Sequence, residues 1–404
     1  MYSRSSTKSN TEQGASPAVR KGRDLTLDLV KGIAILLVIM VHNMAHTNGE
    51  SAADMVVMTF SQCAIPCCFM AAGAVYLNGP GDPAGFGKED AVKQFRKILR
   101  VYLGLAFWKA VYLAVYHSFG APVPGMRDIL TYVFIFGSLP GVNTSHFWFM
   151  EAYITILLIA PLLKEVYLRN RGLFLYIAFV LFLFENGLTG AGLLVRLVCQ
   201  FILHKEPFLL GNLGAVDPFH FQYSFCIFYY MAGGVLYEKR REIPRRYAAV
   251  SFAAGLLGLI LIRYSQYETF LWKGSMVVSG HFWVSTLLMA AGFFLLLTGI
   301  SGAEDASEGS GVPGAEDASE GSGVSGAGSG LPRAAEFFAR TVGQSTEMIF
   351  YIHMPLLVMI DRALYPRLLP YDGILLCAAE SLLPAALGVL LSAGVSRITA
   401  MTKC

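Results

Sequence analysis

Ten long apolar stretches constrain what this chain can fold into more than any other feature of its sequence. A helix needs about 20 mostly apolar residues to cross the hydrocarbon core of a bilayer, and stretches close to that length recur along all 404 residues. Only 15% of the residues are charged, against about a quarter in an average soluble domain. The sequence therefore predicts an all-α fold, a polytopic integral membrane bundle of about ten transmembrane helices.

The stretches are separated by short polar connections. Their approximate bounds are 26–45, 54–77, 99–118, 146–164, 172–187, 219–237, 247–264, 280–300, 343–364 and 373–396. The fifth is short, and residues 190–204 either extend it or lie in the membrane interface.

The distribution of Lys and Arg predicts the orientation of these helices. Ten spans place both termini on one side of the membrane, and the termini and connections on that side hold 23 of the 31 Lys and Arg residues. The alternate connections hold seven, and Lys109 falls within a span. Because basic residues are retained on the cytoplasmic side, both termini are predicted to be cytoplasmic. The net charge of +3 and the dispersal of the basic residues argue against a nucleic-acid partner.

The same pattern divides the chain into membrane and polar segments. Polar cytoplasmic tails are expected at residues 1–24 and 398–404, with no apolar signal peptide before the first span. The membrane domain is expected to carry spans 1–8 in residues 25–300 and spans 9 and 10 in residues 333–397. A polar segment, 301–332, separates its two parts.

This polar segment contains a tandem repeat, GAEDASEGSGVP followed by GAEDASEGSGVS, which begins at Gly302 and again at Gly314. Gly, Ser, Ala and acidic residues cannot bury enough apolar surface to fold. We therefore expect a disordered acidic Gly/Ser linker on the cytoplasmic side, with an acidic interaction segment as the alternative.

The seven cysteines include no CxxC pair. Cys63 and Cys67 are one helical turn apart, which resembles metal-ligand spacing, but their apolar run contains no His, Asp or Glu. Structural packing is favoured over metal or redox chemistry, and no disulfide or metal site is predicted.

One face of the first stretch carries a cation and an imidazole. Asp28 and Lys31 are three residues apart and are expected to share a face near the cytoplasmic end. His42 follows Lys31 by eleven residues, which places both on one stripe, about 16 Å apart along the helix axis. Ionisable residues inside a span are functional candidates by default. The alternative is a snorkelling Lys31 with a His42 that is satisfied by a backbone carbonyl or by Asn43.

Four cations lead into the third stretch at three- and four-residue spacing, namely Lys93, Arg96, Lys97 and Arg100. They can converge on one helix face at the cytoplasmic surface, where guanidinium groups suit the phosphates of a cytosolic ligand. Anchoring to anionic lipid headgroups is the alternative.

Further ionisable residues fall inside other stretches. Glu151 lies one turn below the outer end of the fourth, and His353 lies about 20 Å along the ninth, at a depth similar to that of His42. These two rank first as additional site residues. The others are Lys109, Glu185, His281, Glu347 and Glu380. Because so many charges cannot all face lipid, they are expected to line an interior cavity or to pair there.

The first stretch, with Asp28, Lys31, Gly32 and His42, resembles the opening helix of the acyltransferase 3 family, in which an Arg or Lys is followed after ten residues by a His. The resemblance continues through AIPCCFMAAGAVYL, HFWFMEAYITILLIAPLL and STEMIFYIHMPLL, and covers residues 24–396 apart from the linker. The Arg-x-x-Arg of the family at the start of the third span is Lys97-Ile98-Leu99-Arg100 here. Lys97 keeps the charge but lacks the bidentate fork of Arg.

The resemblance implies a membrane O-acyltransferase. It implies that an acyl group, in the first place acetyl, passes from cytoplasmic acetyl-CoA or another acyl-CoA to a hydroxyl of a cell-surface or lipid-linked carbohydrate. His42 would act as general base or form a transient acyl-imidazole. The CoA phosphates would be held by Lys31, Arg96, Lys97 and Arg100.

Asp28, Glu151 and His353 would support the site, with Glu151 orienting the imidazole and His353 hydrogen-bonding the acceptor or the thioester oxygen. The resemblance implies no permanently bound cofactor and a multi-pass location in a bacterial plasma membrane. The alternative function is a transporter or flippase whose intramembrane His and Glu residues line a substrate or proton path. No half-to-half repeat favours that alternative.

Overall fold

The computed structural model describes residues 23–43, 58–79, 86–135, 139, 142, 145–203, 223–273, 280, 283–300, 331–368 and 374–401. The regular elements in these ranges are helices, and no strand occurs among them. The α-helices are α1 (Leu25–Asn43), α3 (Ala64–Leu77), α4 (Lys88–Ser118), α5 (Met126–Phe134), α6 (Trp148–Arg169), α7 (Arg171–Phe182), α8 (Leu188–Phe201), α9 (Ser224–Lys239), α10 (Arg245–Lys273), α11 (Val284–Thr298), α12 (Arg333–Thr341), α13 (Thr346–Leu368) and α14 (Ile374–Met401).

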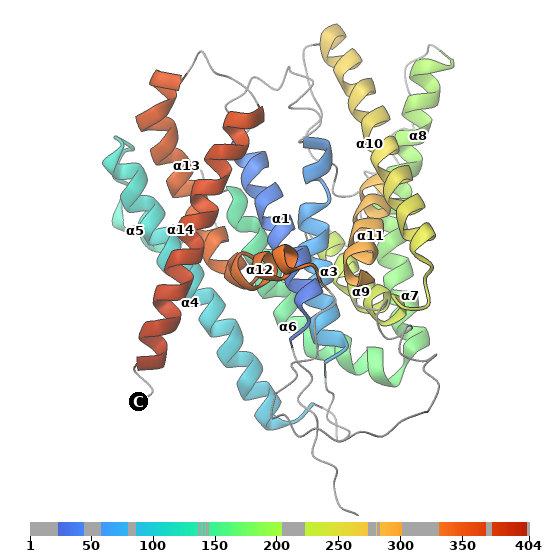
Figure 1. Cartoon of the computed structure of the whole chain (residues 1–404), viewed down its shortest axis with the longest axis horizontal. Coiled ribbons are helices and arrows are strands. Elements are labelled where there is room, and N and C mark those ends of the chain that lie inside the picture. Colours follow the sequence, from blue (N-terminus) through green and yellow to red (C-terminus); the bar gives the residue numbers. More distant parts are fainter. Residues whose placement is uncertain are drawn as a thin grey trace, which may run out of the picture.

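This all-helical architecture confirms the predicted fold class (Figure 1). Among the described residues, five helices are long and apolar enough to cross a membrane: Leu25–Asn43, Met58–Leu77, Lys88–Ser118, Arg171–Gly192 and Arg245–Arg263. The number of ten spans and the side on which the termini lie stay predictions. Most of the predicted N-terminal tail, the repeat linker apart from Leu331 and Pro332, and residues 402–404 lie outside the described part of the chain.

The short fifth stretch continues into the next helix. α7 passes through a π-helical turn, η3 (Leu183–Gly187), into α8 without a break, and Figure 1 shows α8 continuing beyond α7. The backbone is helical as far as Phe201, so the segment after residue 190 extends the fifth stretch. A π-helical turn is a local insertion in a helix and is frequent at functional sites.

Two short helices were not predicted, because both fall below the length of a span. In α5, Met126 and Phe134 are exposed while Tyr132 is buried. In α12, Phe337 is exposed while Ala339 is buried, and Figure 1 shows this helix lying across α1. Each helix therefore packs through one narrow side and leaves apolar residues on the other, which is the pattern of a helix at the membrane interface.

The backbones of α3 and α9 are in direct contact. A Cβ atom added to Gly73 would lie 1.8 Å from the carbonyl oxygen of Tyr230, and one added to Gly233 would lie 2.1 Å from that of Met70. Small residues permit this approach in membrane helices, whose association depends on close packing. α10 and α11 make the same type of contact at Gly255.

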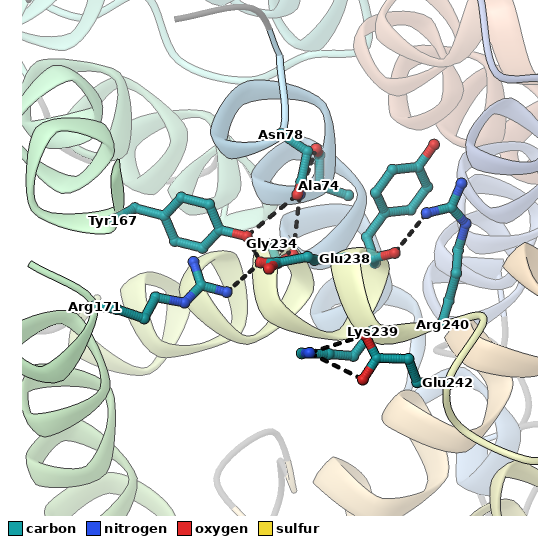
Figure 2. A network of polar contacts seen from close by, with 10 residues as sticks. Ala74, Asn78, Tyr167, Arg171, Gly234, Glu238, Lys239, Arg240 and Glu242 are labelled. Carbon is teal, nitrogen blue, oxygen red and sulfur yellow. Dashed lines mark hydrogen bonds and ion pairs between the residues drawn. The ribbon is translucent and has the colours of Figure 1, made fainter. Parts of the chain in front are cut away.

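A network of polar contacts joins one end of the bundle (Figure 2). The Tyr167 hydroxyl, near the end of α6, donates to the Glu238 carboxylate on α9, and Arg171 at the start of α7 pairs with the same carboxylate. Asn78, just after α3, donates from Nδ2 to the Gly234 carbonyl oxygen at 2.9 Å. This network therefore brings together the ends of α3, α6 and α9 and the start of α7. These helices correspond to the second, fourth, sixth and fifth predicted spans, and spans that cross the membrane in alternating directions would place these four points on the same side.

The first turns of α1 are held on several sides. Asp24 caps the helix by accepting the Thr26 N–H at 2.9 Å, and it also accepts a hydrogen bond from Tyr237 of α9. A Cβ atom on Gly343, in the 3-10 turn η7 (Gly343–Ser345), would lie 2.1 Å from the carbonyl oxygen of Asp28. The backbone of η7 is therefore in contact with α1, the helix that carries the predicted site residues Asp28, Lys31 and His42.

We expect Gly73→Ala to lower the free energy of unfolding by about 1–3 kcal/mol, because the added methyl group overlaps the Tyr230 carbonyl and forces α3 away from α9. Gly394→Ala on α14 is the matched control, since its added Cβ meets nothing within 4 Å. The measurement is the temperature at which half of the detergent-solubilised protein leaves the monodisperse peak on size exclusion. Equal temperatures for Gly73→Ala and the wild type would contradict this packing.

Candidate functional site

Three histidines from separate elements meet inside the bundle and are termed the histidine cluster. His42 lies in the last turn of α1, His146 in the 3-10 turn η2 (Ser145–Phe147) that leads into α6, and His353 two turns into α13. The ring centroids are 5.4 Å apart for His42 and His353, 5.8 Å for His42 and His146, and 5.3 Å for His146 and His353. Each imidazole is therefore a direct neighbour of the other two.

Hydrogen bonds hold two of the three rings. His353 Nδ1 lies 2.6 Å from the carbonyl oxygen of Phe350, to which it donates. His146 Nε2 lies 2.9 Å from the Tyr112 hydroxyl, which donates in turn to the Tyr351 carbonyl oxygen at 3.1 Å. The other two ring nitrogens, His353 Nε2 and His146 Nδ1, are buried and have no hydrogen-bond partner among the described residues.

His42 is the accessible member of the cluster. Its side chain is partly exposed, whereas His146 is 2% and His353 is 0% exposed. The ring contacts of His42 are with the other two imidazoles, and within the described ranges no residue hydrogen-bonds to it. A neutral imidazole in this position can accept a proton from a group that approaches on its open side.

His146 is not among the site residues predicted from the sequence. This residue opens the fourth apolar stretch at its predicted outer end, where a polar residue is ordinary. Its depth in the membrane could have suggested it, because the predicted outer ends of the first and fourth spans lie at the same level. Depth alone does not show whether a side chain points into the bundle. In the structure, the contact with Tyr112 on α4 shows that His146 does.

Glu151, five residues after His146 in the sequence, forms an ion pair in the interior of the bundle. Its Oε1 is 3.3 Å from Lys109 Nζ on α4, and its Oε2 accepts a hydrogen bond from Tyr223 at 3.1 Å. Lys109 is 2% exposed, so the pair neutralises two charges that would be costly in lipid. The predicted pairing of intramembrane charges is therefore observed here, and both oxygens of Glu151 have partners other than His42.

The remaining predicted polar residues are distributed around the bundle. Glu380 on α14 accepts a hydrogen bond from Asn43 Nδ2 at 3.0 Å, which places it beside the end of α1. Glu185 lies in the π-helical turn η3 and accepts a hydrogen bond from Ser224 at the start of α9. His281 lies outside the described residues.

Lys31 and Asp28 share one face of α1 and form an ion pair, as their spacing predicts. Lys31 Nζ is 2.6 Å from Asp28 Oδ1, and Arg23 Nε is 2.5 Å from Asp28 Oδ2. Asp28 is 2% exposed while the Lys31 side chain is 27% exposed. Asp28 is therefore neutralised twice, and the Lys31 side chain remains partly exposed.

The cations on α4 do not all face the same neighbour. Lys97 and Arg100 both interact electrostatically with Glu347 at the start of α13. Lys97 Nζ also lies 5.9 Å from the centre of the Tyr76 ring on α3. Arg96 is exposed and forms no ion pair within the described ranges. The structure thus brings Lys97 and Arg100 together and leaves Arg96 apart.

Cys63 and Cys67 are each in contact with a backbone carbonyl oxygen. Cys67 Sγ lies 3.7 Å from the Ala290 carbonyl oxygen on α11, and Cys63 Sγ lies 3.0 Å from that of Phe60. Both thiols are buried between helices, which agrees with a packing role. In the described part of the chain, no group of three His, Cys, Asp or Glu side chains is arranged to hold a metal ion.

The comparisons with known proteins extend the resemblance given by the motifs. No curated protein and no solved structure matches the chain. A family model described as an acyltransferase domain, that of the acyltransferase 3 family, matches residues 24–401. The match spans nearly the whole chain and includes every element of the histidine cluster. The chain therefore belongs to the acyltransferase 3 family, and it is a membrane acyltransferase.

Proposed function

We propose that this protein transfers an acyl group, acetyl in the first place, from cytoplasmic acyl-CoA to a hydroxyl of a cell-surface or lipid-linked carbohydrate in a bacterial plasma membrane. The observation that carries the proposal is the placement of His42. This imidazole is the accessible member of a buried histidine cluster, and it lies on the helix that presents Lys31 about 16 Å away along its axis.

The donor is proposed to enter from the end of the bundle where α1 begins. Lys31, Lys97 and Arg100 are the cations that would receive the phosphates of CoA, with Arg96 contributing from the exposed side of α4. Charge-assisted hydrogen bonds to phosphate are among the stronger polar contacts in proteins. The pantetheine arm would then run along α1 towards His42 and bring the thioester to the histidine cluster.

The chemistry that follows is a general-base acyl transfer. The hydroxyl proton of the acceptor moves to the bare nitrogen of His42, the oxygen forms a bond to the thioester carbonyl carbon, and the C–S bond breaks. The proton then passes from His42 to the CoA thiolate, which leaves as the free thiol. Burial of the neighbouring rings excludes water from one side of His42 and favours transfer over hydrolysis.

The membrane topology belongs to the same proposal. Ten spans with both termini in the cytoplasm would place Lys31 at the inner surface and the histidine cluster in the outer half of the membrane. The polar contacts around Glu238, which join the ends of α3, α6 and α9 to the start of α7, support the alternating directions of four of these spans.

Fusions that report location test the topology. A cytoplasm-active fluorescent protein is expected to be bright when it is fused after Ile243 or at the C-terminus, because both points follow an even-numbered span. A periplasm-active phosphatase is expected to be active only when it is fused in alternate connections, for example after Gly120. Phosphatase activity at Ile243 would contradict the proposed orientation.

His42→Ala is expected to lower the rate of acyl transfer by about 10²–10⁴-fold, because it removes the proposed general base. The rate is measured as free CoA released from acetyl-CoA in proteoliposomes that contain total bacterial lipid with its lipid-linked sugars. His117→Ala is the matched control, since this exposed histidine bonds the nearby Ala121 carbonyl oxygen at 3.1 Å, away from the cluster. Unchanged turnover in a folded His42→Ala variant would contradict the catalytic assignment.

Lys31→Gln and Arg100→Gln are each expected to raise the KM for acetyl-CoA about tenfold, because each removes one cation from the proposed phosphate site, and tenfold corresponds to about 1.4 kcal/mol. Arg23 still neutralises Asp28 in the Lys31 variant, which limits damage to the fold. Lys88→Gln at the exposed start of α4 serves as the control for net charge. A KM equal to that of Lys88→Gln would remove these residues from the donor site.

A further inference from the structure

A histidine that acts as a base needs an orienting partner. Its second ring nitrogen must donate to an acceptor that fixes both the tautomer and the ring position. In many enzymes that acceptor is a carboxylate. Here the carboxylate nearest in sequence to the cluster, Glu151, has both oxygens engaged by Lys109 and Tyr223, and Glu380 accepts from Asn43.

The hydrogen bond to a backbone carbonyl fixes the tautomer of His353. A carbonyl oxygen only accepts, so Nδ1 carries the proton, and the neutral ring then has a bare lone pair on Nε2. This nitrogen is buried, and no described residue donates to it. An unsatisfied buried acceptor is destabilising, so a donor is expected to complete its hydrogen bonding.

His146 is held in a similar way. Tyr112 has one hydroxyl proton, which it gives to the Tyr351 carbonyl, so His146 donates from Nε2 to the Tyr112 oxygen and keeps a bare Nδ1. The cluster therefore presents two neutral imidazoles with bare nitrogens beside His42. Both nitrogens are shielded from solvent, so a substrate cannot reach them directly.

We propose that His353 is a positioning residue: a turn of the neighbouring His42 ring lets the bare Nε2 of His353 accept the N–H of His42, which directs the other nitrogen of His42 towards the acceptor hydroxyl. The geometry favours His353 over His146 for this role. The centre of its ring is 5.4 Å from that of His42, against 5.8 Å for His146, and its bond to a carbonyl oxygen is compatible with one tautomer only. This inference rests on the proposed function.

A neutral partner suits this location. A carboxylate beside His42 would place a net negative charge in the membrane-spanning bundle, which is costly unless the charge is paired. An imidazole accepts the same hydrogen bond without that charge. The polar groups around the pair are His146 with Tyr112, and Glu380 through Asn43 next to His42. Glu151, five residues after His146 in the sequence, is paired with Lys109, so both carboxylates already have partners.

Two substitutions of similar size separate positioning from packing. His353→Phe fills the space of the ring but offers no acceptor, whereas His353→Gln places an amide oxygen near the position of Nε2. We expect His353→Phe to lower kcat for CoA release from acetyl-CoA about 100-fold, since a displaced base loses that order of rate, with the KM for acetyl-CoA unchanged. The kcat of His353→Gln is expected to be about tenfold higher than that of His353→Phe, or more.

The assay uses the full-length protein in proteoliposomes of total bacterial lipid, beside His117→Ala, and monodispersity in detergent is recorded for each variant. A kcat for His353→Phe equal to that of the wild type would overturn the inference. Equal losses in the Phe and Gln variants would also overturn it, because a purely structural role does not depend on an acceptor. No CoA release by the wild-type protein would contradict the proposed function itself.

Discussion

Charge is costly to place in hydrocarbon, and the polar interior of this bundle is arranged so that its charges are paired or absent. Lys109 and Glu151 pair inside the bundle, and Asp28 is neutralised by both Lys31 and Arg23 near the start of α1. The histidine cluster meets the same constraint differently, with neutral rings held by a carbonyl and a hydroxyl. The histidine cluster can therefore lie deep in the protein without carrying a net charge.

The helix α1 connects this site to the proposed donor entrance. Its early turns are in contact with η7 through Gly343 and are capped by Asp24, so the stripe that bears Lys31 and His42 has a fixed rotation. The close contact of α3 with α9 gives a rigid base for that helix to pack on. A rigid scaffold matters because acyl transfer requires the acyl donor and the acceptor to meet within a narrow range of positions.

Helical periodicity predicted some of these features directly. The ion pair of Asp28 and Lys31 follows from a three-residue spacing, and the common depth of His42 and His353 follows from the rise of a helix. Apolar length predicted the helical membrane class. The partners of Glu151 and the inward turn of His146 could not be predicted, because they depend on how α4, α6 and α13 rotate against one another. The short helices α5 and α12 lack the length by which spans are recognised.

The proposed role of His42 in acyl transfer to a carbohydrate can be tested by mass spectrometry of surface and lipid-linked glycans from cells that carry the wild-type gene, no gene, or the His42→Ala gene expressed at the same level. We expect glycans heavier by one acetyl group only in the cells with the wild-type gene. The same acetylated species in His42→Ala cells, or their absence from wild-type cells, would contradict it.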